Sequence, residues 1–171
     1  MQYLGFIAAG VLALGLAAQG SAAELKVGAG ATTGALDNED YHLGYGAIGN
    51  LAVEQPLGMM TETQLAIRGN YLNYQPEDNT PGEALDQAGV NLAALVGPSG
   101  MVLEPKVGGH VGYDRFEGDN FLDLGADVLA AFKITPMVEL QATVTPTWLM
   151  NQDDTDYLTK VALGVQWTPG M

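Results

Sequence analysis

The stretch YLTKVALGVQW, residues 157–167, alternates strictly between two kinds of side chain. Successive side chains of an extended strand point to opposite faces, so a period of two predicts a β-strand with two unlike faces. One face carries Tyr157, Thr159, Val161, Leu163, Val165 and Trp167, and the other carries Leu158, Lys160, Ala162, Gly164 and Gln166. The environment of each face is therefore the central question that the sequence raises.

Seven further segments alternate in the same way, at residues 25–33, 41–53, 61–74, 87–96, 101–114, 122–134 and 138–150. Most are about ten residues long or longer, which is enough for a tilted transmembrane strand. Short connections alternate along the chain with polar, acidic ones. The short connections are 54–58, 97–100 and the turn at 135–136, and the acidic ones are 32–40, 75–86, 114–120 and 151–156. This order predicts an all-β fold, an eight-stranded antiparallel up-and-down β-barrel with one tight-turn end and one loop end. It is a transmembrane β-barrel if its apolar faces point outward to lipid.

The N-terminal residues 1–23 have the pattern of a secretory signal peptide. An apolar run from Leu4 to Ala18 precedes the small residues Ala22 and Ala23, where cleavage is expected. This leaves residues 24–171 as the barrel domain. The chain has no cysteine for disulfides, and its net charge of −14 argues against nucleic acid as a partner.

The basic residues limit which face can meet lipid. Placing Lys or Arg in lipid costs about 2–4 kcal/mol at the bilayer midplane. Five of the six basic residues lie on the polar faces of the expected strands, and the sixth, Arg115, is expected in a loop. A soluble barrel with its apolar faces inside would show the same distribution, so this observation does not decide between the two.

Aromatic residues on the apolar faces separate the two alternatives better. They gather near the two ends of the expected strands, as in the aromatic girdles at membrane–water boundaries. The loop-end group is Tyr41, Tyr45, Tyr71, Tyr113, Trp148 and Tyr157, and the turn-end group is Phe132 and Trp167. The sequence therefore predicts that the apolar faces contact lipid and that the polar faces line a lumen.

Charged residues of both signs are expected inside this lumen. An eight-stranded barrel is just wide enough for side chains to fill, and opposite charges confined there should pair. The predicted lumen charge network is Lys26, Glu62, Arg68, Glu104, Lys106, His110, Asp123, Asp127, Lys133, Glu139 and Lys160. We expect Arg68, paired with Asp127 or Glu62, at the centre of a plug.

Two prolines fall inside expected strands. Pro105 and Pro146 cannot donate to a strand ladder, so we expect a bulge or a position near the membrane boundary. A local break in strand pairing is expected at Pro146.

These features resemble the small outer-membrane barrels of Gram-negative bacteria, namely the OmpA transmembrane domain and the OmpX group. They also resemble, to a lesser degree, the YfaZ-like barrels. The alternating C-terminal strand that ends at Trp167 resembles the signal that the outer-membrane assembly machinery reads, although residues 168–171 follow it. The resemblance implies location in the bacterial outer membrane and folding from the periplasm. It also implies outer-membrane lipid, lipopolysaccharide and the assembly machinery as partners.

No catalytic site, cofactor or metal centre is expected. The histidines His42 and His110 both fall on lumen faces, and Ser99 lies in a tight turn at the opposite end, which argues against a lipid-modifying Ser–His enzyme. The acidic loops are candidates for binding divalent cations or for a solvated rim. The expected role is structural or interactive; the alternatives are a narrow porin-like channel for small solutes or cations and a soluble periplasmic lipocalin-like lipid carrier.

Overall fold

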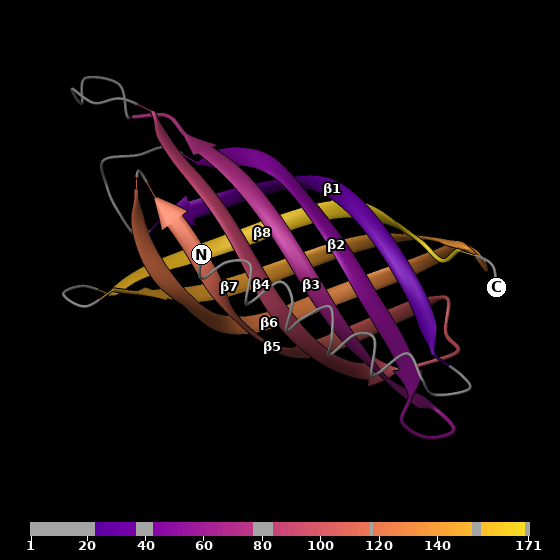
Figure 1. Cartoon of the computed structure of the whole chain (residues 1–171). Helices are drawn as coiled ribbons and strands as arrows, with labels where there is room; N and C mark the ends of the chain where they lie inside the picture. Colours follow the sequence, from indigo (N-terminus) through magenta and orange to yellow (C-terminus); the bar gives the residue numbers. More distant parts are fainter. Residues whose placement is uncertain (1–22, 37–42, 77–83, 117, 152–154, 170–171) are drawn as a thin grey trace.

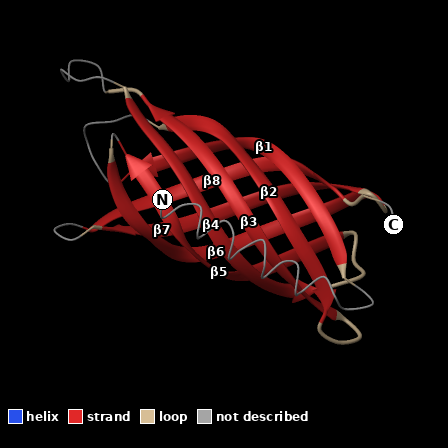
Figure 2. Cartoon of the chain, viewed as in Figure 1, coloured by secondary structure: helices blue, strands red, loops and turns tan. Residues whose placement is uncertain are grey.

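The computed structural model describes residues 23–36, 43–76, 84–116, 118–151 and 155–169. Eight antiparallel strands follow one another around a closed barrel, and β1 pairs with both β2 and β8 (Figures 1 and 2). The strands are β1 (Glu24–Leu36), β2 (Gly44–Pro56), β3 (Thr61–Tyr74), β4 (Leu85–Pro98), β5 (Leu103–Phe116), β6 (Asp119–Thr135), β7 (Val138–Met150) and β8 (Thr155–Trp167). The predicted fold class is confirmed. The proposed signal peptide, Tyr41 and His42 lie outside the described residues, apart from Ala23.

Exposure along β8 shows which face points outward. Val161, Leu163 and Val165 are exposed, Leu163 by 65%, whereas Lys160 and Gln166 are buried. The other strands alternate in the same sense, so the apolar faces form the outer wall and the polar faces the interior. No helix in the described part of the chain is long and apolar enough to cross a membrane.

The connections sort to two ends of the barrel. Three short turns, the start of β1 and the end of β8 lie at one end in Figure 1. The expected loop 114–120 is wrong: Phe116 pairs with Asp119, so only two residues join β5 and β6. Gly118 has φ of 112°, which suits a tight turn. Both strands extend because Phe116 and Phe121 pack together, with ring centroids 5.5 Å apart.

The two prolines behave differently. The β6–β7 ladder skips the pairs around Pro146 between Gly125↔Thr147 and Val128↔Val144, so the expected break is confirmed. The β5–β6 register runs past Pro105 without a bulge. The β4–β5 ladder has already ended at Val96↔Val107, so no ladder hydrogen bond to β4 is lost through the missing N–H of Pro105. A register shift occurs instead between Lys133 and Thr135, near the turn into β7.

Close packing of β2 against β3 explains why residue 46 is a glycine, and this explanation can be tested. A Cβ on Gly46 would lie 1.7 Å from the backbone oxygen of Tyr71, so β2 and β3 must separate to admit it. We expect Gly46→Ala to lower the free energy of unfolding by about 1–3 kcal/mol, as overpacking does. Urea unfolding in lipid vesicles measures this change. Gly58→Ala is the matched control, because nothing lies within 4 Å of a Cβ there; equal effects of the two variants would contradict the packing argument.

Candidate functional site

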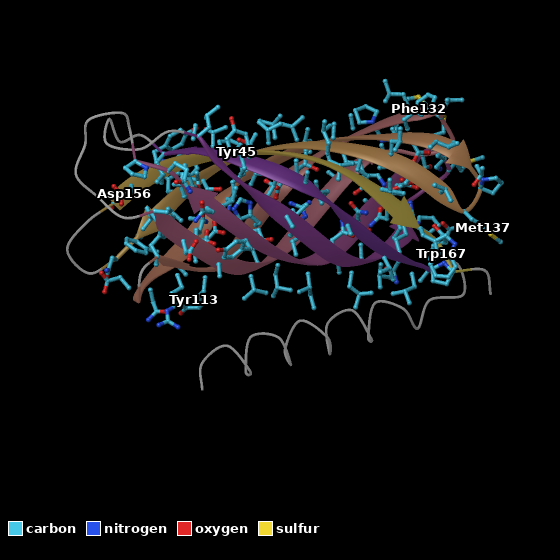
Figure 3. All side chains as sticks on the ribbon, turned by 90° about the horizontal axis from the view of Figure 1, so that it is seen from above. Tyr45, Tyr113, Phe132, Met137, Asp156 and Trp167 are labelled. Atoms are coloured by element: carbon cyan, nitrogen blue, oxygen red, sulfur yellow. The ribbon has the colours of Figure 1, made fainter. Side chains whose placement is uncertain are left out.

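The interior of the barrel is the candidate site, because it concentrates nearly all of the basic residues. Side chains in Figure 3 project both outward from the wall and into the space between the strands. All eleven residues of the predicted lumen network lie on inward-facing strand positions, and ten of them are buried. Lys133, at the turn-end mouth, is partly exposed.

At the turn end, two lysines share the carboxylate of Glu54. Lys26 Nζ lies 2.5 Å from Glu54 Oε2 and 3.0 Å from Glu139 Oε2. Lys106 Nζ contacts Glu54 Oε1 and lies 2.7 Å from Glu62 Oε1. Each ammonium therefore meets two carboxylates, and Glu54 links the two lysines into one cluster. Glu62 pairs here with Lys106, not with Arg68.

A second ion pair lies close to the same mouth. Lys133 Nζ donates to Glu104 Oε1 at 2.7 Å, and the backbone N–H of Gly100 donates to the same oxygen at 2.8 Å. Glu104 is fully buried. It therefore ties the β4–β5 turn to the interior network.

Side-chain amides separate this cluster from the barrel centre. Gln141 donates to Glu139 at 2.7 Å and also contacts Gln166. Gln166 in turn accepts from Gln64 at 3.4 Å and donates to Asn50 at 3.3 Å. Amides both donate and accept, so this layer continues the hydrogen-bonded fill across the lumen.

The centre is built around Asp127. Arg68 Nη1 donates to Asp127 Oδ1 at 2.6 Å, and Thr145 donates to the same oxygen at 3.0 Å. His110 lies between two carboxylates, with Nδ1 3.0 Å from Asp127 Oδ2 and Nε2 2.8 Å from Asp123 Oδ1. Ionised carboxylates only accept, so this geometry suits an imidazolium that donates on both sides.

Lys160 extends the network from the centre toward the loop end. Its Nζ lies 3.2 Å from Asp114 Oδ2 and 3.5 Å from Asp123 Oδ2. Both aspartates are fully buried. Asp123 therefore links the imidazole of His110 to the ammonium of Lys160.

An apolar plug closes the loop-end side of the interior. Its five buried members come from the four strands β3, β5, β7 and β8, and Leu36, Leu85 and Phe121 pack against them. Tyr74, fully buried, donates its hydroxyl to Gln87 Oε1 at 2.9 Å, which satisfies its polar end. The buried members are Leu72, Tyr74, Phe116, Leu149 and Leu158.

Free space is small at the centre and larger at the turn-end mouth, where a cavity of about 90 Å³ is lined partly by Glu54, Glu62 and Lys133. A cavity of about 30 Å³ beside Arg68 is lined partly by Gly28, Asn50 and Gln141. That volume holds roughly one or two waters. No group of three or more His, Cys, Asp or Glu residues in the described ranges is placed to hold a metal ion.

Sequence reasoning missed two carboxylates and the apolar plug. The sequence pattern suggests a turn at Glu54, but β2 continues to Pro56 and keeps this residue on the inward face. It suggests the end of a strand at Asp114, but β5 continues to Phe116. The signal was present, because both residues extend the polar alternation of their strands by one step.

Of all outward-facing strand positions that the structure describes, only two are charged, Asp86 and Arg115. Both lie at the loop end; Arg115, expected in a loop, is a β5 residue paired with Asn120. Asp86 Oδ1 accepts from Tyr71 at 2.7 Å and from Asn73 at 2.8 Å. The rest of the outer wall is therefore free of charge.

The aromatic residues mark the two ends of this uncharged wall. At the loop end, Tyr45 and Tyr71 are exposed, Tyr113 is half-buried, and the rings of Trp148 and Tyr157 meet with centroids 5.9 Å apart. Figure 3 shows Tyr45 and Tyr113 toward one end and Phe132 and Trp167 toward the other.

The spacing of these aromatics along one strand gives the height of the wall. Tyr157 and Trp167 both lie on β8. Their separation, at about 3.3 Å per residue and a tilt of about 45°, spans roughly 23 Å, close to the apolar band of outer-membrane barrels.

The turn-end cluster provides a matched pair of variants. Glu54 serves two lysines, whereas Glu62, at the mouth, serves one. We expect Glu54→Gln to lower the free energy of unfolding by about 3 kcal/mol, the cost of breaking a buried ion pair, and Glu62→Gln by less than half as much. Urea titrations of both variants in the same vesicles compare them directly, and a larger loss for Glu62→Gln would contradict the assignment of Glu54 as the link.

Comparison with solved structures places the fold. The neisserial surface protein A superimposes with a TM-score of 0.58 at 12% identity, over 86% of this chain and 97% of that one. The Yersinia pestis attachment invasion locus protein Ail superimposes with a TM-score of 0.56 at 13% identity, over 86% of this chain and 99% of that one. A major outer membrane protein from Thermus thermophilus superimposes with a TM-score of 0.61 at 15% identity, over 85% of this chain and 99% of that one. No protein-family model matches the chain, and no curated protein matches it in sequence.

At these identities the likeness concerns the fold. The closed eight-stranded meander, the uncharged outer wall and the ion-paired interior together define a closed eight-stranded barrel with the fold of outer-membrane β-barrels. The chain is similar in fold to the neisserial, Yersinia and Thermus barrels.

Proposed function

We propose that this barrel is a non-conducting outer-membrane protein whose role is structural or interactive. The observation that supports this most is the filled interior. Ion pairs at the turn end, an amide layer, the Arg68–Asp127–His110 centre and the apolar plug follow one another along the lumen. A solute would have to separate buried opposite charges to pass, at a cost of several kcal/mol. The proposal includes no catalytic step.

The proposed route to the membrane follows from both ends of the sequence. Residues 1–23 would act as a cleaved secretory signal, and the chain would reach the bacterial outer membrane through the periplasm. The alternation of β8 up to Trp167 supports recognition by the assembly machinery, since this strand closes the barrel against β1.

The proposed contacts lie at the loop end. Asp119 and Asp156 are exposed at strand ends there, and the connections between strands are acidic in sequence. An acidic rim concentrates cations. We therefore place divalent cations, lipopolysaccharide or a partner at this end, with Arg115 the one basic residue on the described outer wall.

The alternatives differ in their demands on the interior. A lipocalin-like lipid carrier needs an apolar cavity, and the buried charges inside this barrel do not fit one. A narrow channel needs a continuous polar path, which the apolar plug interrupts.

Planar-bilayer recording tests the proposal. The purified barrel is expected to insert without discrete conductance steps in symmetric KCl. A double variant, Leu72→Ser with Leu158→Ser, removes part of the plug and serves as the comparison for a partly opened lumen. Reproducible steps from the unmodified protein would overturn the sealed lumen in favour of the channel.

A further inference from the structure

The tight-turn end carries a surface that the proposed function does not use. Its three turns are residues 57–60, 99–102 and 136–137, and we call their surface the methionine rim. Every one of these turns contains a methionine, and none contains a charged residue. The rim consists of Leu57, Gly58, Met59, Met60, Ser99, Gly100, Met101, Val102, Pro136 and Met137.

The large side chains of the rim are strongly exposed. Met59 is fully exposed, and Met60, Leu57 and Val102 are 75%, 67% and 64% exposed. Turns that face water usually carry polar residues, and a gathered exposed apolar surface marks an interaction site. The turns at this end are therefore unlike the loop-end connections, which are acidic in sequence. The charged residues Glu24 and Lys133, exposed and partly exposed at this end, lie on strands and not in the turns.

Backbone hydrogen bonds hold the turns to their neighbours. The N–H of Ser99 donates to the Met60 oxygen at 3.1 Å, which joins the first two turns. The N–H of Lys133 donates to Val102 at 3.0 Å, and the N–H of Thr168 donates to Met137 at 2.8 Å. These bonds join the first turn to the second, the second turn to β6, and the third turn to the residue after β8.

The rim continues the lipid-facing wall. Leu103 and Ile134, next to two of the turns, are exposed outward-facing strand residues, as are the girdle aromatics Phe132 and Trp167. Figure 3 shows Met137 beside Trp167 at the same end of the barrel. No charged outward-facing side chain in the described strands separates the rim from the wall.

We infer that the methionine rim docks into the surface of the bilayer at its end of the barrel, at the boundary between headgroups and acyl chains. This inference rests on the proposed membrane location. Continuity with the lipid-facing wall and the lack of charge favour lipid as the occupant over a protein partner or a second copy. Methionine side chains are flexible and polarisable, so they adapt to an irregular lipid surface. The turns would then be embedded, and the Lys133–Glu104 mouth would lie at headgroup depth.

Depth-dependent quenching tests this inference. The chain has no cysteine, so single-cysteine variants can be labelled with a fluorophore without further changes. Met59→Cys probes the rim, Leu163→Cys the middle of the wall, and Asp119→Cys the aqueous loop end. Each is folded into phosphatidylcholine vesicles formed with iodide on both sides, or with nitroxide attached to the lipid at a shallow or a deep position. High salt screens the repulsion between iodide and the acidic loop end, so that the two labels can be compared.

The Met59→Cys label is expected to be quenched by the shallow nitroxide, and by iodide roughly threefold less than the Asp119→Cys label. Equal iodide quenching of the two would overturn the inference. Shielding from iodide without nitroxide quenching, increasing with protein density, would also overturn it and indicate a second copy. If the Leu163→Cys label escapes the deep nitroxide, the membrane location itself fails. Met137→Cys replaces Met59→Cys should the latter not fold, as judged by its gel mobility before and after boiling.

Discussion

Replacing Arg68 by alanine is expected to lower the free energy of unfolding by about 3–5 kcal/mol, the cost of leaving a buried charge without its partner. Asp127 is 1% exposed and would keep only His110 and Thr145. Because the interior is sealed, bulk water cannot solvate the carboxylate of Asp127 in place of Arg68. The loss should therefore be among the largest from any single substitution in the lumen.

Urea unfolding in lipid vesicles, followed by the fluorescence of Trp148 and Trp167, measures this loss. Arg68→Lys keeps the charge but loses the planar guanidinium, so it should lose less stability than Arg68→Ala. Replacing both partners, Arg68→Met with Asp127→Leu, should recover part of the loss, because neither charge of the pair remains buried alone. The recovery should be incomplete, since His110 loses the acceptor of its Nδ1 and keeps only Asp123. Unchanged stability and conductance in Arg68→Ala would refute the central ion pair.

Replacing Leu163 by arginine is expected to cost about 2–4 kcal/mol, because it places a charge near the bilayer midplane. Leu163 lies near the middle of β8 and is 65% exposed on the outer wall. On a water-exposed sheet the same change would cost little, since surface substitutions usually stay within about 0.5 kcal/mol. The size of the effect therefore reports what the wall touches.

The same unfolding assay measures the Leu163→Arg variant. Leu163→Ala is the control for lost side-chain volume, and Leu25→Arg, at the start of β1, probes the edge of the wall, where the depth-dependent cost should fall to about 0–1 kcal/mol. A neutral Leu163→Arg substitution would contradict the lipid-facing assignment.

Most of the fold could be predicted from the sequence because period-two alternation is a local property. In β8, the exposed Val161, Leu163 and Val165 and the buried Lys160 and Gln166 follow it directly. The end of a strand is less local. β5 and β6 extend past the apolar band because Phe116 and Phe121 pack together, and the sequence of 114–120 alone suggests a loop.

The sequence predicts most of the charged residues that lie in the lumen, but it does not predict which of them form ion pairs. Arg68 and Asp127 are 59 residues apart, and only the stagger of strands around the closed barrel brings them together. The apolar plug was not foreseen, since Leu72 and Leu158 interrupt the polar faces of their strands and a single strand cannot show that such residues meet. Pairing depends on tertiary geometry that alternation does not encode.

Electrophoretic mobility, measured on unheated and boiled samples of the isolated outer-membrane fraction, tests most directly whether the chain is a closed barrel with its apolar wall in lipid. The account predicts that the unheated protein resists denaturation by detergent and shifts in mobility after boiling. It also predicts that the protein is found in the outer-membrane fraction. Recovery in the soluble periplasmic extract, with no shift on boiling, would contradict the assignment of the outer wall to lipid.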